Sequence, residues 1–147
     1  MANVSNAGYT AVVKRIVFAD SVSTSYPFAW MEVGSGSAGG AQASISLTSA
    51  IADTNMSKMS MTAGVATNAD GRYFASSTDS IAGDTAWFRH TWTCGVTGPI
   101  ASGVKECGIF NSATVGDMLC YGTFPTAIPM GTGDTLQVTW SVQVKAG

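Results

Sequence analysis

Ten residues near the C-terminal end, TLQVTWSVQV at positions 135–144, carry the clearest structural signal in the sequence. Apolar side chains occupy every second position, and Gln, Thr or Ser occupy the positions between them. Successive side chains of a β-strand point to opposite faces of a sheet, so this period of two indicates a strand with one buried face. We predict a strand over Thr135 to Val144 whose core face carries Leu136, Val138, Trp140, Val142 and Val144.

Seven further stretches are rich in β-branched and aromatic residues and are bounded by clusters of Gly, Pro, Asn, Asp and Ser, which is typical of strands. These predicted strands are Thr10 to Ala19, Phe28 to Val33, Ser44 to Leu47, Gly71 to Ala75, Ala86 to Cys94, Lys105 to Phe110 and Met118 to Phe124. Pro125 and Pro129 are expected in a loop, because proline cannot donate to a strand ladder. Eight strands predict an all-β fold, an antiparallel, jelly-roll-like β-sandwich.

At most one short helix is expected, within Thr48 to Thr62, where apolar residues recur at helical spacing. The length of 147 residues suits a single domain with one core. We expect an irregular arm over residues 1–10, a single β-sandwich domain over residues 11–147, and a flexible glycine-rich loop at Gly34 to Gly40.

Charged residues make up only 11% of the chain, against roughly 25% in an average soluble protein. A surface with so few charges suits a protein that is covered by other subunits. The seven basic residues form no run longer than two, so no nucleic-acid partner is expected. The first thirty residues show no signal peptide and no apolar run is long enough to span a membrane, so we expect no membrane association.

The three cysteines, Cys94, Cys107 and Cys120, lack the C-x-x-C spacing of zinc and redox sites. Free buried thiols are the first interpretation. The alternative concerns Glu106 to Tyr121, which is typical of a hairpin. A turn over Ser112 to Val115 would place Cys107 opposite Cys120, so a cross-strand disulfide stays open.

Two motifs could suggest chemistry, and neither has the context it needs. Residues 34–39, GSGSAG, match the dinucleotide fingerprint G-x-G-x-x-G, but the following Ser44 to Leu47 is typical of a strand rather than of the helix that a βαβ unit requires. His90 is the only histidine and has no recognisable partners for a metal site or a catalytic triad. We expect no cofactor, no metal and no enzymatic activity.

The nine acidic residues mostly lie beside Gly, Ser or Thr, where carboxylates accept hydrogen bonds in turns. A calcium site built from loop acids is the alternative.

The tryptophans divide into core and surface candidates. In Ala86 to Cys94, alternation places Phe88, His90, Trp92 and Cys94 on one face and Trp87 and Arg89 on the other. Trp92 and Trp140 fall on apolar faces and are expected in the core, which leaves Trp30 and Trp87 for the surface. The residues that we expect to contact partners are Trp30, Trp87, Arg89, Tyr9 and Tyr26.

The C-terminal half resembles a group of small structural proteins of tailed bacteriophages. The similarity lies in short strand and turn stretches: Gly108-Ile109-Phe110-Asn111, Asp117-Met118-Leu119, Thr123-Phe124-Pro125 and Gly133-Asp134-Thr135-Leu136-Gln137-Val138-Thr139-Trp140. Residues 29–36, AWMEVGSG, resemble that group's apolar strand leading into a Gly-Ser loop. The cysteines at positions 107 and 120 depart from the group's pattern.

This resemblance implies a virion structural protein, assembled in the bacterial cytoplasm. Our leading expectation is a capsid decoration or cement protein, a homotrimer that binds the major capsid protein and stabilises the head by its binding free energy. The alternative is a tail, neck or head-fibre component that binds a receptor or glycan through exposed Trp30 and Trp87.

Overall fold

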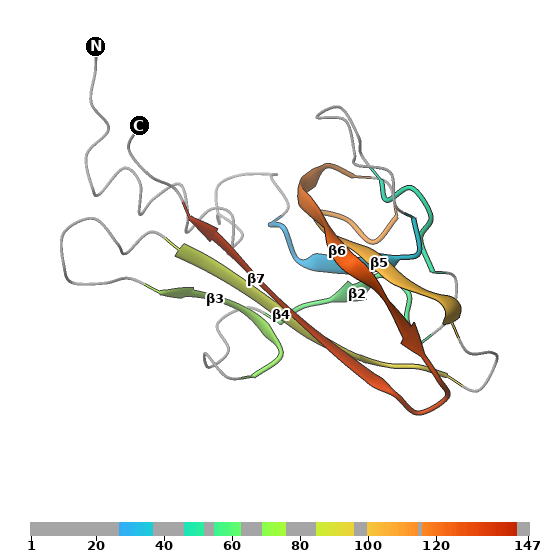
Figure 1. Ribbon diagram of the computed structural model, residues 1–147. Helices are drawn as coiled ribbons and strands as arrows, with labels where there is room; N and C mark the ends of the chain where they lie inside the picture. Colours follow the sequence, from blue (N-terminus) through green and yellow to red (C-terminus); the bar gives the residue numbers. More distant parts are fainter. Residues whose placement is uncertain are drawn as a thin grey trace, which may run out of the picture.

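The computed structural model describes residues 27–36, 46–51, 55–62, 69–75, 85–95, 100–114 and 116–143, which form seven β-strands and no helix (Figure 1). The strands are β1 (Trp30–Gly34), β2 (Met59–Ser60), β3 (Gly71–Ala75), β4 (Thr85–Thr93), β5 (Ile100–Phe110), β6 (Met118–Met130) and β7 (Thr135–Gln143). They make two antiparallel sheets with strand orders β2-β1-β5-β6 and β3-β4-β7. The all-β antiparallel prediction is confirmed, and the sheets do not close into a barrel.

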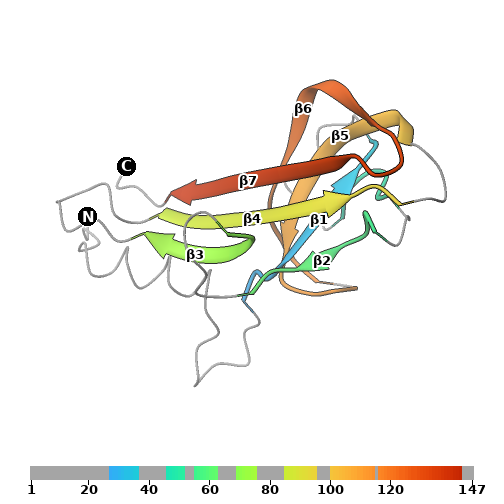
Figure 2. The same cartoon turned by 90° about the horizontal axis from the view of Figure 1, so that it is seen from below.

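The two sheets pack against each other through one face each, and their strands cross at a steep angle (Figure 2). The four-stranded sheet contributes Met31, Val33, Cys107 and Ile109 to a single buried cluster. The three-stranded sheet contributes Ala86, Phe88, Trp92, Leu136 and Val138 to the same cluster. These positions follow the period of two in β1, β4 and β7, so alternation in the sequence sets which face of each sheet is buried.

The β4–β7 pair is the most regular part of the structure. Nine consecutive residue pairs join these strands, from Thr85 opposite Gln143 to Thr93 opposite Thr135, without a register shift. Phe88, Trp92 and Cys94 are buried, as their alternation predicted.

Two parts of the chain are more strand-like than expected. β5 begins at Ile100 rather than Lys105, and β6 continues to Met130 through both Pro125 and Pro129. The prediction that these prolines lie in a loop is therefore wrong. β6 is an edge strand of its sheet, where a residue without an N–H group costs no ladder hydrogen bond on the outer side.

The helix expected within residues 48–62 is absent from the described residues of that range. Their backbone hydrogen bonds go to β1 instead: Ser35 N–H donates to Ser49 O at 2.8 Å, and Ile51 N–H donates to Val33 O at 3.2 Å. Met59 then opens β2, which pairs with β1. The segment follows a sheet edge because its backbone C=O and N–H groups, such as Ser49 O and Ile51 N–H, are paired there rather than within a helical turn.

Some predictions fall beyond the described residues. The arm at residues 1–10 and the strand Thr10 to Ala19 lie outside them, as do Ser44 and Ile45 of the predicted strand Ser44 to Leu47. Ser46 and Leu47 are described and are not in a strand.

The hairpin predicted over Glu106 to Tyr121 is formed by β5 and β6, but its register differs from the one that would pair two cysteines. Cys107 lies opposite Gly122, and Cys120 lies opposite Ile109. An extra β6 residue between the pairs Phe110–Met118 and Ile109–Cys120 shifts the register. Cys107 and Cys120 are free thiols in diagonal positions, so they are not the directly opposed pair that the sequence suggested.

A buried carboxylate lies beneath the glycine-rich segment. Glu106 is fully buried; its Oε1 accepts a 2.9 Å hydrogen bond from Ser49 N–H, and its Oε2 has no hydrogen-bond partner among the residues that the structure describes. A Cβ atom added at Gly34 or Gly36 would lie 2.6 or 2.5 Å from Glu106 Oε1. Of the loop expected over Gly34 to Gly40, Gly34 is the last residue of β1, Gly34 and Gly36 lie against this carboxylate, and residues 37–40 lie outside the described part.

This packing predicts an energetic coupling between Gly36 and Glu106. Gly36→Ala should destabilise the fold because its methyl group meets the carboxylate, and Glu106→Ala should cost about 1–3 kcal/mol because Ser49 N–H loses its acceptor. In the double variant the carboxylate that the methyl group would meet is absent. The loss of stability should therefore be smaller than the sum of the two single losses by about 0.5–3 kcal/mol. Urea denaturation of the four proteins measures this coupling, and additive losses would contradict it.

Candidate interaction surface

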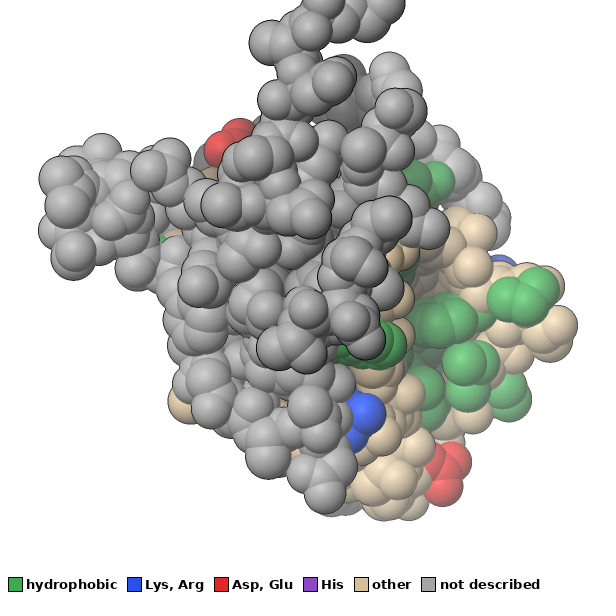
Figure 3. Space-filling view, turned by 90° about the vertical axis from the view of Figure 1, so that its left-hand side faces the viewer, with side chains coloured by type: hydrophobic (Ala, Val, Ile, Leu, Met, Phe, Trp, Pro, Cys, Tyr) green, Lys and Arg blue, Asp and Glu red, His purple; other side chains and the backbone are tan. Residues whose placement is uncertain are grey.

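One side of the molecule is formed by two edge strands, one from each sheet. β6 borders the four-stranded sheet and β7 borders the three-stranded sheet, and both lie at the front of Figure 1 and the top of Figure 2. We call the surface formed by these two strands the β6–β7 side. Neither the 13 residues of β6 nor the 9 of β7 include a charged residue. On the corresponding side of Figure 3, at the right, apolar side chains gather among other uncharged side chains and backbone, and charged side chains lie at the border of this group.

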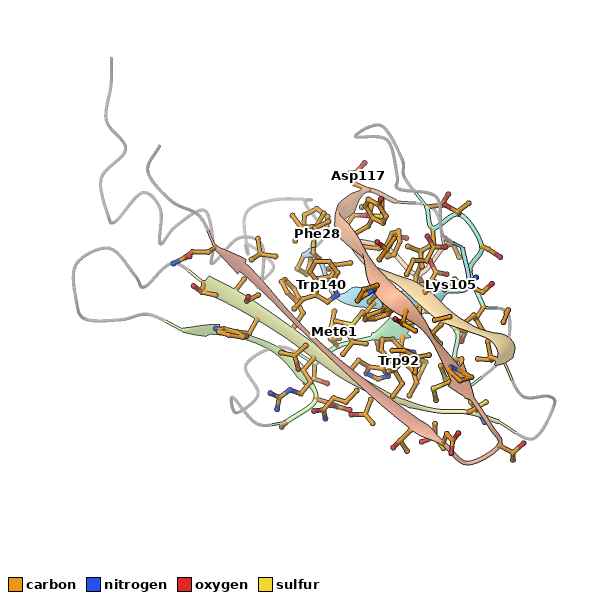
Figure 4. The ribbon with its side chains drawn as sticks, in the orientation of Figure 1. Phe28, Met61, Trp92, Lys105, Asp117 and Trp140 are labelled. Carbon is orange, nitrogen blue, oxygen red and sulfur yellow. The ribbon has the colours of Figure 1, made fainter. Side chains whose placement is uncertain are left out.

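Trp140 connects the two sheets on this side. It comes from β7 (Figure 4), and its indole Nε1–H donates a 3.3 Å hydrogen bond to Cys107 Sγ of β5. A Cβ atom added at Gly122 of β6 would lie 2.8 Å from Trp140 Cη2. Glycine at position 122 therefore lets the indole lie directly against the β6 backbone. Trp140 is half-buried, so the prediction that it contributes to the core holds for only part of its surface.

Two shallow hollows flank the same region and share Thr123 and Phe124. One, of about 280 Å³, is lined also by Gly122, Val138, Thr139 and Trp140. The other, of about 340 Å³, is lined also by Lys105, Pro125 and Ala127. These volumes lie at the lower limit of roughly 300–1,000 Å³ for small-molecule pockets. They suit a side chain of a partner protein better than a large cofactor.

The thiols beneath this surface are held in the protonated form. Burial raises the pKa of Cys107 to about 12, although the hydrogen bond from Trp140 acts in the opposite direction. Burial likewise raises the pKa of Cys120 to about 11. Because the thiolate is the reactive species, neither cysteine is suited to nucleophilic or redox chemistry at neutral pH.

The outer face of the three-stranded sheet is polar and hydrogen-bonded. Arg89 Nε donates to Thr139 Oγ1 at 3.1 Å, and Gln137 Nε2 donates to Thr91 Oγ1 at 3.0 Å. The Asp70 carboxylate accepts hydrogen bonds from the backbone N–H and the hydroxyl of Thr91, both at 2.9 Å. This face therefore carries hydrogen-bonded polar groups, among them the charged side chains of Arg89 and Asp70.

The residues expected to contact partners do not form one site. Trp87 and Arg89 alternate with buried Ala86 and Phe88 and so lie on the outer face of the three-stranded sheet. Trp30 alternates with buried Met31 and so lies on the outer face of the other sheet. Trp30 and Trp87 therefore belong to opposite faces of the molecule, which does not favour a single stacking platform. Tyr9 and Tyr26 lie outside the described residues.

His90 lies on the inner side of β4, half-buried, with its ring edge-on to Trp92 at a centroid distance of 4.7 Å. Burial lowers the pKa of His90 below its ordinary value of 6.5, and the Asp70 carboxylate partly opposes this effect.

Within the described residues, no group of three or more His, Cys, Asp and Glu side chains could hold a metal ion. The same residues include no helix of the length and apolarity that crossing a membrane requires.

Comparison with known proteins finds no matching family model, no similar curated protein and no similar solved structure.

The β6–β7 side was not singled out from the sequence. The available signal was the absence of charge over residues 118–130, but the two prolines made that stretch resemble a loop. The roles of Gly122 and Phe124 carry no local signal, because they depend on which residue of another sheet lies opposite them.

The contact between Gly122 and Trp140 predicts an unusual response to substitution. Valine is favoured over glycine in strands, yet Gly122→Val should destabilise the fold by about 1–3 kcal/mol because its side chain displaces the indole. Thr123→Val, at the adjacent exposed position, is the control and should have little effect. Thermal or urea denaturation compares the two variants. A neutral or stabilising effect of Gly122→Val would show that the indole does not require this close approach.

The environment of His90 predicts a pH-dependent stability. The unfolded chain takes up a proton near pH 6.5, whereas the folded chain does so only at lower pH, so stability should fall as the pH drops below about 6.5. In His90→Gln this part of the pH dependence should disappear. Urea midpoints at pH 7.5 and 5.5 for both proteins test the prediction. An equal decrease in both would assign the pH dependence to other groups.

Proposed function

We propose that this chain is a non-enzymatic structural protein of a tailed-bacteriophage particle, a capsid decoration protein that binds the major capsid protein and copies of itself. The observation that carries this proposal is the β6–β7 side, whose 22 strand residues (13 + 9) include no charged side chain, with Lys105 of β5 and Arg89 of β4 at its borders. An uncharged surface with half-buried apolar groups is costly for an isolated protein and is suited to contact with a partner.

The resemblance of the C-terminal half to small phage structural proteins supports the choice of partner. The stretches that carry it include Asp117-Met118-Leu119, Thr123-Phe124-Pro125 and Gly133 to Trp140, which contribute to β6, β7 and the turns that flank them. The finer fold that we propose is a jelly-roll-like sandwich of about eight strands, one of which is the strand predicted over Thr10 to Ala19.

The mechanism of such a protein is thermodynamic linkage. A ligand that binds only the assembled shell stabilises that shell by its own binding free energy. The stabilisation is repeated at every occupied site of the shell, so a small domain without catalytic groups is sufficient to strengthen the head. Shallow hollows such as those beside Phe124 are suited to accept side chains from the lattice.

The test is a cryo-electron-microscopy map of phage particles whose genome encodes this chain. We expect many copies on the outside of the head, at regular lattice positions, with β6 and β7 against a neighbouring subunit. Heads that lack the protein should release DNA at a lower temperature than complete heads, and adding the purified protein should restore the difference. A few copies at the neck, tail or fibres would overturn the decoration role and favour a receptor- or glycan-binding component.

A further inference from the structure

The outer edges of the two sheets differ in their protection against pairing with another strand. Exposed edge strands pair with other chains unless they are short, charged, bulged or interrupted by proline. Among the described strands, β2 has two residues and β3 has five, so both edges are short. β6 is long, but it contains Pro125 and Pro129 and its register with β5 is shifted at three places.

β7 has none of these protective features. It is nine residues long, contains no proline and no charged residue, and keeps an unbroken register with β4. In Figure 2 it forms the border of its sheet, and no described strand pairs with its outer edge. A regular, uncharged edge of this length is a template for a further strand.

A hydrogen bond at the end of the β4–β7 ladder shows which backbone groups of β7 point toward β4 and which point away from it. Cys94 N–H donates a 2.8 Å hydrogen bond to Asp134 O, so the even-numbered residues of this strand direct their backbone groups toward β4. The odd-numbered residues, from Thr135 to Gln143, direct their N–H and C=O groups away from β4. These groups are the ones that an added strand would meet.

We propose that β7 pairs antiparallel with β7 of a second copy of this chain, around a two-fold axis at Thr139. In this register Thr139 lies opposite its own copy, Gln137 opposite Ser141 and Thr135 opposite Gln143. On the other face, Leu136 lies opposite Val142 and Val138 opposite Trp140. Every pair on one face is polar and uncharged and every pair on the other is apolar, so the strand is complementary to itself over its full length.

A second copy fits this edge because β7 itself contains no charged residue, so no charged side chain of the strand lies opposite its own copy; the nearest charge among the described residues is Arg89 of β4, whose Nε donates to Thr139 Oγ1. Thr–Thr and Gln–Ser pairs form favourable cross-strand contacts. The pairing joins two three-stranded sheets into one sheet of six strands, and it brings the half-buried Val142 and Trp140 of each copy beside apolar residues of the other. An isologous contact of this kind closes as a dimer and leaves no unpaired β7 edge.

This inference rests on the geometry of β7 and not on the proposed function. The location of the chain in a particle and the pairing of β7 are measured separately, so either can fail without the other.

Sedimentation velocity of the purified full chain tests the pairing. We expect a species of twice the chain mass of 15.1 kDa. Ser141→Lys places a charge on the β7 edge and should shift the mass to that of one chain at the same concentration. Thr93→Lys is the matched control, because Thr93 is exposed on the same sheet but lies on the central strand β4, and it should leave the dimer unchanged.

A disulfide cross-link tests whether the two-fold axis passes through position 139. Thr139→Cys should form a covalent dimer under mild oxidation, whereas Thr93→Cys should not. A monomeric wild-type chain, or an oligomer that Ser141→Lys leaves intact, would overturn the proposal. It would also be overturned if chemical cross-linking and peptide mapping placed β7 against residues 10–19 of the same chain, since that strand would then occupy the edge.

Discussion

Burial of one face of the β4–β7 ladder against β1 and β5 is the constraint on which the rest of the structure depends. The chain has few charges and many small residues, so among the described residues this apolar layer is the main source of stability. Phe88 and Trp92 from one sheet meet Met31 and Ile109 from the other within one buried cluster. Since neither sheet can bury its apolar face alone, the two sheets must fold together.

Joining two sheets in this way leaves an open side where the edge strands lie, and the molecule closes it with aromatic side chains. Trp140 reaches from β7 to Cys107 across Gly122. The indole is held by a hydrogen bond at one end and by close backbone contact along its ring, and part of it stays exposed. The residues that close the core are therefore the same residues that form the uncharged surface proposed for partner binding.

The other face of the four-stranded sheet, which points away from the three-stranded sheet, is packed differently. There a carboxylate, rather than an apolar side chain, fills the space beneath the segment at residues 34–36. A buried carboxylate with one unpaired oxygen is costly. Glycine at positions 34 and 36 lets the backbone approach the Glu106 side chain closely. Ser49 N–H donates the one hydrogen bond that this carboxylate accepts from the described residues.

Several features could be predicted from the sequence because they depend on local periodicity. The alternation in residues 135–144 and 86–94 identified β7, β4 and their buried faces, and strands β1, β3, β5 and β6 were located within a few residues at one or both ends. The extension of β6 through Pro125 and Pro129, the path of residues 48–62 along β1, and the register that separates Cys107 from Cys120 were not predictable. Each depends on a partner strand distant in the sequence, since an edge position tolerates proline and a single bulge shifts every pair beyond it. The same reason separates Trp30 from Trp87: alternation shows that each points away from the core, but only the packing of two sheets decides that they point in opposite directions.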